Sequence, residues 1–167
     1  MERKLRVLVV DDEELIRELI VEAVEPFIDG GEIIEVSDGQ EALEAFREQR
    51  IDILITDIRM PRVSGEELVE CLEEYSFKVP MLVVTGHGDR EMAIRLMRLG
   101  AFDFLEKPFD SELLEERISR AVESRRKILL ELNLAEEKLV EKGLIGSIDE
   151  YYQLGYEERR ALIKKMS

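Results

Sequence analysis

Five polar side chains in this sequence stand where a run of strand-forming residues ends. In chain order they are Asp11, Asp12, Asp57, Thr85 and Lys107. Parallel strands of an α/β sheet end at one edge, and ligands bind just beyond that edge. We therefore expect the five side chains to lie together, although each of them alone is most often only a polar residue that ends a strand.

Three carboxylates and a lysine at one edge of a sheet favour phosphoryl chemistry with a metal ion. Carboxylates at close quarters repel each other, so at neutral pH they need a cation or shifted pKa values. Mg²⁺ meets this need because it binds few carboxylates together with waters and a phosphate oxygen. A hydroxyl and an ammonium group could contact the other oxygens of a phosphoryl group. The nucleophile would be one of the carboxylates, and the product an aspartyl phosphate.

The elements that position these side chains alternate between strand and helix. The predicted strands are Leu5–Val10, Ile33–Val36, Ile53–Thr56, Pro80–Thr85 and Ala101–Leu105. The predicted helices begin near Asp11, Gln40, Ser64, Arg90 and Ser111. This alternation predicts an α/β fold, a doubly wound five-stranded parallel sheet of flavodoxin-like type, because parallel strands need crossover connections. In the first helix, the spacing of Leu15, Leu19, Ile20 and Ala23 predicts the buried face.

The last of these helices is predicted to extend to about Lys142, roughly four to five turns beyond what covers a sheet. We divide the chain into a domain at 1–124 and a helical extension at 125–167. An apolar stripe with three- and four-residue spacing, interrupted at Arg125, runs along this helix; its members are Leu114, Ile118, Ala121, Ile128, Leu132, Ala135 and Leu139. Such a stripe favours a partner helix, which predicts a homodimer through the extended helix. The alternative is that the extension folds back on its own domain.

Composition narrows the range of partners. The net charge of −15 argues against a nucleic-acid partner, because nucleic-acid binding depends on basic surface against phosphate. No apolar run approaches the roughly 18 residues of a membrane-spanning helix. The start of the chain leads directly into a strand without the apolar region of a signal peptide. We therefore expect a soluble cytoplasmic protein with no nucleic-acid or membrane partner.

Four segments together resemble the receiver domain of bacterial two-component response regulators. They are Val-Val-Asp11-Asp12-Glu-Glu, Thr-Asp57-Ile-Arg-Met-Pro61-Arg-Val-Ser-Gly65, Val-Thr85-Gly-His-Gly-Asp and Phe104-Leu-Glu-Lys107-Pro108-Phe109. The resemblance covers about residues 4–124, and the joint pattern is highly specific. The last two segments are most similar to receivers of transcription-activator type. The extension at 125–167 does not resemble a DNA-binding module.

The resemblance implies a role for each site residue. Asp57 is expected to be the phosphoacceptor and Asp12 a direct Mg²⁺ ligand, with Asp11 supporting the metal through water. The backbone carbonyl of Arg59 is expected to complete the protein's share of the metal coordination, to which Asp57 also contributes. Lys107 is expected to be the cation on the phosphate, and its bond to Pro108 is expected to be cis, which proline makes feasible.

The resemblance also implies a switch. Thr85 is expected to be the switch hydroxyl and Phe104 the switch aromatic, where many receivers have a tyrosine. Arg59 and His87 occupy positions that, in this family, flank the path of the attacking water and modulate dephosphorylation. The alternative for these two is that they are solvated loop residues.

The expected function is phosphorelay signalling rather than enzymatic turnover. A sensor histidine kinase would phosphorylate Asp57, and the surface of the fourth helix, fifth strand and fifth helix would change state. The readout would be a homodimer or a separate output protein. A Mg²⁺-dependent aspartate-nucleophile phosphatase is the main alternative, but Asp11 is followed two residues on by Glu13, where such enzymes have a second aspartate. A non-signalling scaffold would have no need for all five polar residues.

Overall fold

The computed structural model describes residues 4–73, 79–86, 90–147, 161, 162 and 165. Its elements are β1 (Arg6–Val10), α1 (Glu14–Val24), the 3₁₀ turn η1 (Glu25–Phe27), β2 (Glu32–Val36), α2 (Gly39–Glu48), β3 (Ile53–Thr56), α3 (Gly65–Cys71), β4 (Met81–Thr85), α4 (Arg90–Arg98), β5 (Asp103–Glu106) and α5 (Ser111–Glu141). All strand pairs are parallel, and the sheet order is β2-β1-β3-β4-β5. The predicted fold class is confirmed.

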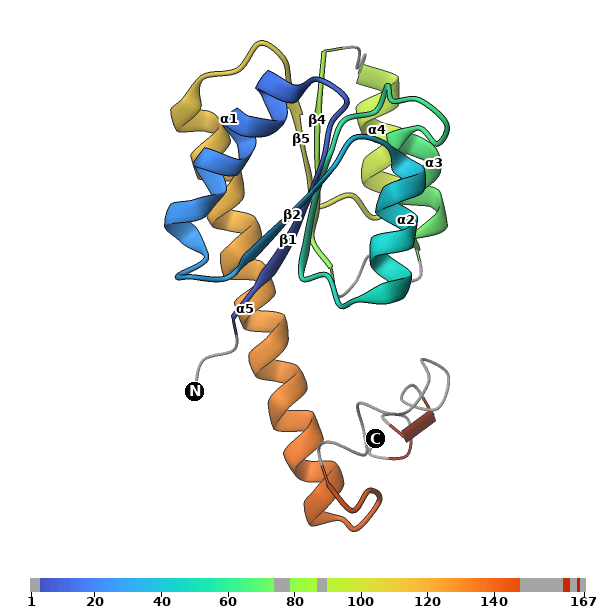
Figure 1. Cartoon of the computed structure of the whole chain (residues 1–167). Helices are drawn as coiled ribbons and strands as arrows, with labels where there is room; N and C mark the ends of the chain where they lie inside the picture. The colour runs from blue at the N-terminus through green and yellow to red at the C-terminus, as the bar shows by residue number, and fades with distance from the viewer. Residues whose placement is uncertain (1–3, 74–78, 87–89, 148–160, 163–164, 166–167) are drawn as a thin grey trace. The chain divides into compact units, whose positions relative to one another are not determined.

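The apolar character of the strands follows their place in the sheet. The central strands β3 and β4 are buried along their whole length, and β1 is buried after its first residue. The edge strands β2 and β5 are only partly buried. Helix α1 and the part of α5 up to residue 125 lie on one face of the sheet, and α2, α3 and α4 lie on the other (Figure 1), as expected for strands that are apolar on both faces.

Strand register brings the predicted site residues to one edge. Val10 of β1 pairs with Thr56 of β3, so the residues that follow them, Asp11 and Asp57, leave the sheet side by side. The amide of Asp57 donates a hydrogen bond to the carbonyl of Val10 (2.9 Å). The amide of Lys107 donates in the same way to the carbonyl of Thr85 (2.9 Å), which extends the β4–β5 ladder into the site.

The predicted buried face of α1 is wrong for two residues. Leu15 is 78% exposed and Leu19 is 39% exposed, whereas Ile20 and Val24 are buried. On the side of α1 that faces the sheet, the buried residues Ile20 and Val24 lie four positions apart. Leu15 and Leu19 share this spacing but each lies one position too early in the chain to belong to the buried stripe. One residue turns a helix by about 100°. An exposed apolar pair, Leu15 and Leu19, therefore lies in the first two turns of α1.

The chain divides into two compact units, residues 1–125 and 126–167. Arg125 interrupts the apolar stripe because it belongs to the first unit, where it is buried and its Nη2 lies 2.8 Å from Asp52 Oδ1. In the second unit, Leu139 and Ile145 are buried together. Helix α5 ends at Glu141, and Gly143 follows with φ of 67°. The hydrogen bonds from the amides at 143 and 144 to Val140 and Leu139 form a Schellman motif.

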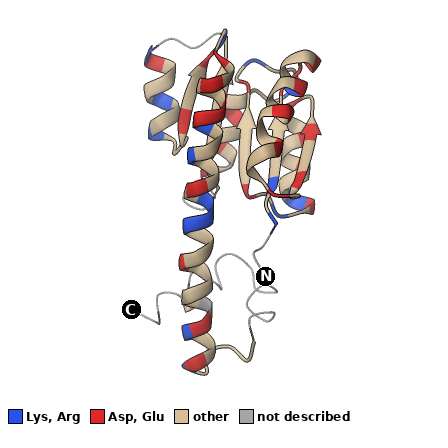
Figure 2. Ribbon diagram, turned by 90° about the vertical axis from the view of Figure 1, so that its left-hand side faces the viewer, with Lys and Arg blue, Asp and Glu red and all other residues tan. Residues whose placement is uncertain are grey.

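The part of α5 beyond residue 125 keeps apolar side chains in solvent. Leu130 is 61% exposed and Leu134 is 50% exposed, one turn apart. Acidic and basic residues also lie along this helix (Figure 2). Across the residues that the structure describes, no helix is both long enough and apolar enough to span a bilayer.

Candidate metal centre at the carboxyl edge of the sheet

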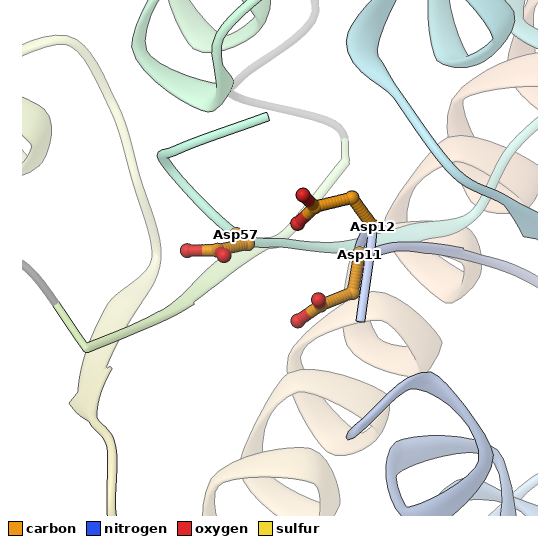
Figure 3. A group of neighbouring side chains, drawn as sticks. All are labelled: Asp11, Asp12 and Asp57. Carbon is orange, nitrogen blue, oxygen red and sulfur yellow. The ribbon is translucent and has the colours of Figure 1, made fainter. Parts of the chain in front are cut away.

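Three aspartates meet beyond the carboxyl ends of β1 and β3. One carboxylate oxygen from each of Asp11, Asp12 and Asp57 lies within 4.8 Å of the other two. Their side chains point into the same region (Figure 3). Asp11 and Asp57 are buried and Asp12 is exposed. The cluster therefore has a closed side within the sheet and an open side that a small ligand can reach.

The two carboxylate oxygens of Asp57 have different partners. Oδ1 accepts a short hydrogen bond of 2.6 Å from the amide of Ile58, and Oδ2 lies 3.4 Å from Lys107 Nζ. The backbone around Asp57 is also closely packed. A Cβ added to Gly65 would lie 1.9 Å from the carbonyl oxygen of Asp57, so no side chain fits there without a backbone shift. Asp57 is thus fixed with one oxygen directed toward the lysine.

Lys107 joins three carboxylates across the site. Its Nζ lies 2.9 Å from Asp11 Oδ2, 3.1 Å from Glu13 Oε1 and 3.4 Å from Asp57 Oδ2. Partial burial alone lowers the pKa of Lys107, but its hydrogen bonds to Asp11 and Glu13 outweigh burial, and the pKa lies above its ordinary value. The ammonium group therefore keeps its charge at neutral pH.

Asp11 experiences the opposite balance. Burial raises the pKa of its carboxyl, and the hydrogen bonds from Lys107 and from the amide of Glu13 only partly offset burial, so the pKa lies above its ordinary value. A raised pKa in the folded state means that ionised Asp11 costs stability at neutral pH. A bound cation at the cluster would remove part of this cost.

The donor set fits a hard divalent cation. The ammonium group of Lys107 contacts Asp11, Glu13 and Asp57, and Asp12 belongs to the same cluster, so four acidic side chains gather around one described cation. The cluster offers only oxygen donors, and Asp12 faces solvent, from which water ligands can complete the shell. This combination is what Mg²⁺ prefers. Asp11, Asp12 and Asp57 would hold the ion, which would supply positive charge next to an incoming phosphoryl oxygen.

The structure locates most of the other predicted residues. Thr85 is fully buried at the end of β4, and Phe104 lies half-buried on β5, opposite Val83. Arg59 is exposed in the loop after Asp57, and the Lys107-Pro108 bond is cis, as expected. His87 lies outside the described residues. The sequence does not predict the contact of Glu13 with Lys107, because acidic residues after a strand are typical of the start of a helix.

A metal ion at this cluster should stabilise the fold. A ligand that binds only the native state stabilises it by about 2.7 kcal/mol at a hundredfold excess over its Kd, which corresponds to a rise in melting temperature of roughly 5–10 °C for a chain of this size. We expect Mg²⁺ to raise the melting temperature of the wild type in this way in a thermal scan, and to have almost no effect on Asp12→Asn.

The matched control is Asp29→Asn, which changes an exposed aspartate outside the cluster. This variant should retain the full stabilisation by Mg²⁺. An equal shift in Asp12→Asn and the wild type would show that the ion acts elsewhere on this acidic protein.

Comparison with known proteins agrees with the geometry. Residues 7–119 match the response regulator receiver domain family. The chain is 36% identical over 145 residues to the C4-dicarboxylate transport transcriptional regulatory protein DctD of Pseudomonas aeruginosa, which covers 84% of this chain and 31% of that protein. It is 40% identical over 116 residues to the transcriptional regulatory protein FixJ of Rhizobium meliloti, which covers 69% of this chain and 55% of FixJ.

A solved structure shows the same fold. The response regulator receiver domain protein from Clostridium thermocellum superposes with a TM-score of 0.64 and 35% identity, over 75% of this chain and 98% of that one. The chain thus spans about a third to a half of the two curated relatives and nearly all of an isolated receiver domain. The chain therefore belongs to the response regulator receiver domain family, the modules of two-component signalling that are phosphorylated on an aspartate.

Proposed function

We propose that a sensor histidine kinase transfers a phosphoryl group to Asp57 of this chain, with Mg²⁺ held by Asp11, Asp12, Asp57 and the backbone carbonyl of Arg59. The observation that carries the proposal is the placement of the Asp57 carboxylate. Its Oδ1 is fixed by the amide of Ile58, and its Oδ2 lies beside Lys107 Nζ and within reach of the acidic pair. Asp11 has a similar pair of contacts, with the amide of Glu13 at Oδ1 and Lys107 at Oδ2. The family motif around Asp57 is what assigns the phosphoacceptor role to Asp57 and the metal to Asp11.

The transfer needs position and charge more than additional chemistry. Asp57 Oδ2 would attack the phosphorus of the phosphohistidine, forming a P–O bond as the P–N bond breaks and the electron pair returns to the imidazole. The charge on the transferring group spreads over its three other oxygens. Lys107 would stabilise one of these oxygens and the Thr85 hydroxyl another. Glu13 would give up its contact with Lys107 as the lysine turns to the phosphate.

The same contacts would start the switch. The Thr85 hydroxyl would move toward the phosphate and Phe104 would follow it, which changes the surface of α4, β5 and α5. This surface has apolar side chains to offer a partner, since Ile94 and Met97 of α4 are 42% and 46% exposed. Phe104 cannot donate a hydrogen bond outward, so its rotamer alone would report the state. Arg59 and His87 would modulate dephosphorylation.

The kinase and the output would use different surfaces. The kinase would use α1 next to the site, where Leu15 and Leu19 are exposed. The readout would be a homodimer through the extended α5, supported by the exposed Leu130 and Leu134, or a separate output protein.

We place this module in the cytoplasm, without enzymatic turnover beyond phosphotransfer and autodephosphorylation. Its net charge of −15 does not favour nucleic acid or an anionic membrane surface as partner.

The proposal is tested by light-scattering mass in Mg²⁺, with and without beryllofluoride as a mimic of the phosphoryl group. We expect the wild type to bind the mimic and change mass, Asp57→Ala to do neither, and the exposed-residue control Glu22→Gln to behave as the wild type. Binding of the mimic without a change in mass would support the acceptor and exclude the dimer as readout. No binding of the mimic would contradict the phosphoacceptor itself.

A further inference from the structure

We propose that Arg62 is a positioning residue for the metal centre: by binding Asp38 at the start of α2, it fixes the loop that carries the Arg59 carbonyl. This inference rests on the proposed function, because it concerns the same Mg²⁺ site. It adds two residues, Arg62 and Asp38, to which the proposed function assigns no role.

Asp38 joins the loop to a helix with both of its oxygens. Its side chain is buried, and Oδ1 caps α2 by accepting hydrogen bonds from the amides of Gln40 (2.8 Å) and Glu41 (3.1 Å). Its Oδ2 accepts from Arg62 Nε (2.9 Å) and from Arg62 Nη2. An arginine that binds one carboxylate through two nitrogens is held in orientation as well as in position. The loop is therefore fastened to the fixed first turn of α2.

The backbone of Arg62 has an unfavourable conformation, which the contact with Asp38 helps to hold. Arg62 has φ of 65°, a left-handed conformation that residues with a Cβ rarely adopt. The next residue is held as well, because a Cβ added to Gly39 would lie 2.3 Å from the carbonyl oxygen of Val63. Residues 62 and 63 thus contact residues 38 and 39 through a side-chain pair and a close backbone approach. A chain held in this conformation needs stabilising contacts around it.

The other end of the loop is fixed in the core. Ile58 is buried, and its carbonyl accepts a hydrogen bond of 2.8 Å from the amide of Gly65. Only residues 59–61 lie between this anchor and Arg62. The Arg59 carbonyl, the proposed metal ligand, therefore belongs to a short span with two fixed ends. Releasing Arg62 from Asp38 would free one end and leave the Asp57 side chain in place.

The pair keeps its charge at neutral pH. Burial alone raises the pKa of Asp38, but the hydrogen bonds from Arg62 and from the amides of Glu41 and Gln40 outweigh burial, and the pKa lies below its ordinary value. The Asp38 carboxylate is therefore ionised at neutral pH. Outer contacts that orient metal ligands commonly change metal affinity by about 10- to 100-fold when removed.

The test measures the Kd for Mg²⁺ by titration calorimetry on the full chain. Arg62→Gly removes the side chain but adopts the left-handed conformation freely, so we expect its Kd to rise about tenfold while its melting temperature stays near that of the wild type. Arg62→Lys keeps the charge but not the two-nitrogen geometry of the guanidinium group, so its Kd for Mg²⁺ should lie between those of the wild type and Arg62→Gly.

Asp38→Asn can still cap α2 and should weaken Mg²⁺ binding as Arg62→Gly does. The double variant should bind no more weakly than either single one.

Arg6→Ala is the matched control. Its Nε makes a similar exposed pair with Glu32 (2.8 Å), on strands β1 and β2 at their amino ends, and its Kd for Mg²⁺ should equal that of the wild type. An unchanged Kd in Arg62→Gly, with the wild type binding Mg²⁺ and Asp12→Asn failing to, would overturn this inference and leave the proposed function intact. Absence of Mg²⁺ binding by the wild type would overturn both.

Discussion

The Asp57→Asn variant is expected to take up no phosphoryl group under conditions in which the wild type takes up one per chain. An amide is a far weaker nucleophile than a carboxylate, and Asp11, the other aspartate beside Lys107, is assigned to the metal in the proposed function. Asparagine still offers an oxygen to the amide of Ile58, which binds Asp57 Oδ1 at 2.6 Å, so the loop should keep its structure. Labelling should therefore be lost without a loss of folding.

The measurement is intact mass after incubation with acetyl phosphate or with a phosphorylated histidine kinase, both with Mg²⁺. The label on the wild type should be stable in acid and labile in alkali, as an acyl phosphate is. Asp29→Asn, an exposed aspartate replaced by the same residue, should be labelled as the wild type is. Equal labelling of Asp57→Asn, located at Asp11 or Asp12, would contradict the assignment. Steady turnover of a small phosphate ester would favour the phosphatase alternative.

The site residues at the strand ends could be predicted because the rule that places them is simple. Each apolar run ends in a polar residue, and parallel strands end at one edge, so Asp11 and Asp57 had to meet once the sheet was recognised. Register then fixed Lys107 beside Thr85. No side-chain rotamer had to be known for this result.

Contacts between distant loops could not be predicted in the same way. Glu13 meets Lys107 across 94 residues of sequence, and Arg62 meets Asp38 across 24. Both depend on the conformation of a loop, and neither belongs to a periodic pattern. The exposure of Leu15 and Leu19 on α1 could not be predicted for a different reason. Two apolar stripes overlap in that helix, and the sequence does not say which of them faces the sheet.

The contact of Arg125 with Asp52 also joins distant parts of the sequence. Replacing Arg125 should have the largest effect on stability. Asp52 is fully buried at the start of β3. It accepts hydrogen bonds from Arg125 Nη2 (2.8 Å) and Nε (3.1 Å), from Arg50 Nη2 (2.8 Å), and from the amide of Arg6 (2.9 Å). Arg125 is itself buried, so the pair lies in an environment where an unpaired charge is costly.

The Arg125→Met variant should lose about 3 kcal/mol of the free energy of unfolding, measured by chemical denaturation at neutral pH. Removing one member of a buried ion pair costs about 3–5 kcal/mol because the other charge is left uncompensated. We expect the lower end of this range, since Arg50, which is 40% exposed, still contacts Asp52. Lys127→Met, at an exposed position two residues further along α5, should change the same free energy by no more than about 0.5 kcal/mol.

A second substitution separates lost pairing from lost packing. In Asp52→Asn/Arg125→Met no buried charge remains, and the asparagine oxygen can still accept from the amide of Arg6. If the cost of Arg125→Met arises from the stranded carboxylate, the double variant should regain most of it. If the cost arises from the arginine's packing against the sheet, the double variant should be no more stable than Arg125→Met. The first result would mean that the ion pair of Asp52 and Arg125 holds α5 against the sheet at the last residue of the first unit. This pair lies at the amino end of β3, and Asp57 lies at the other end of the same strand.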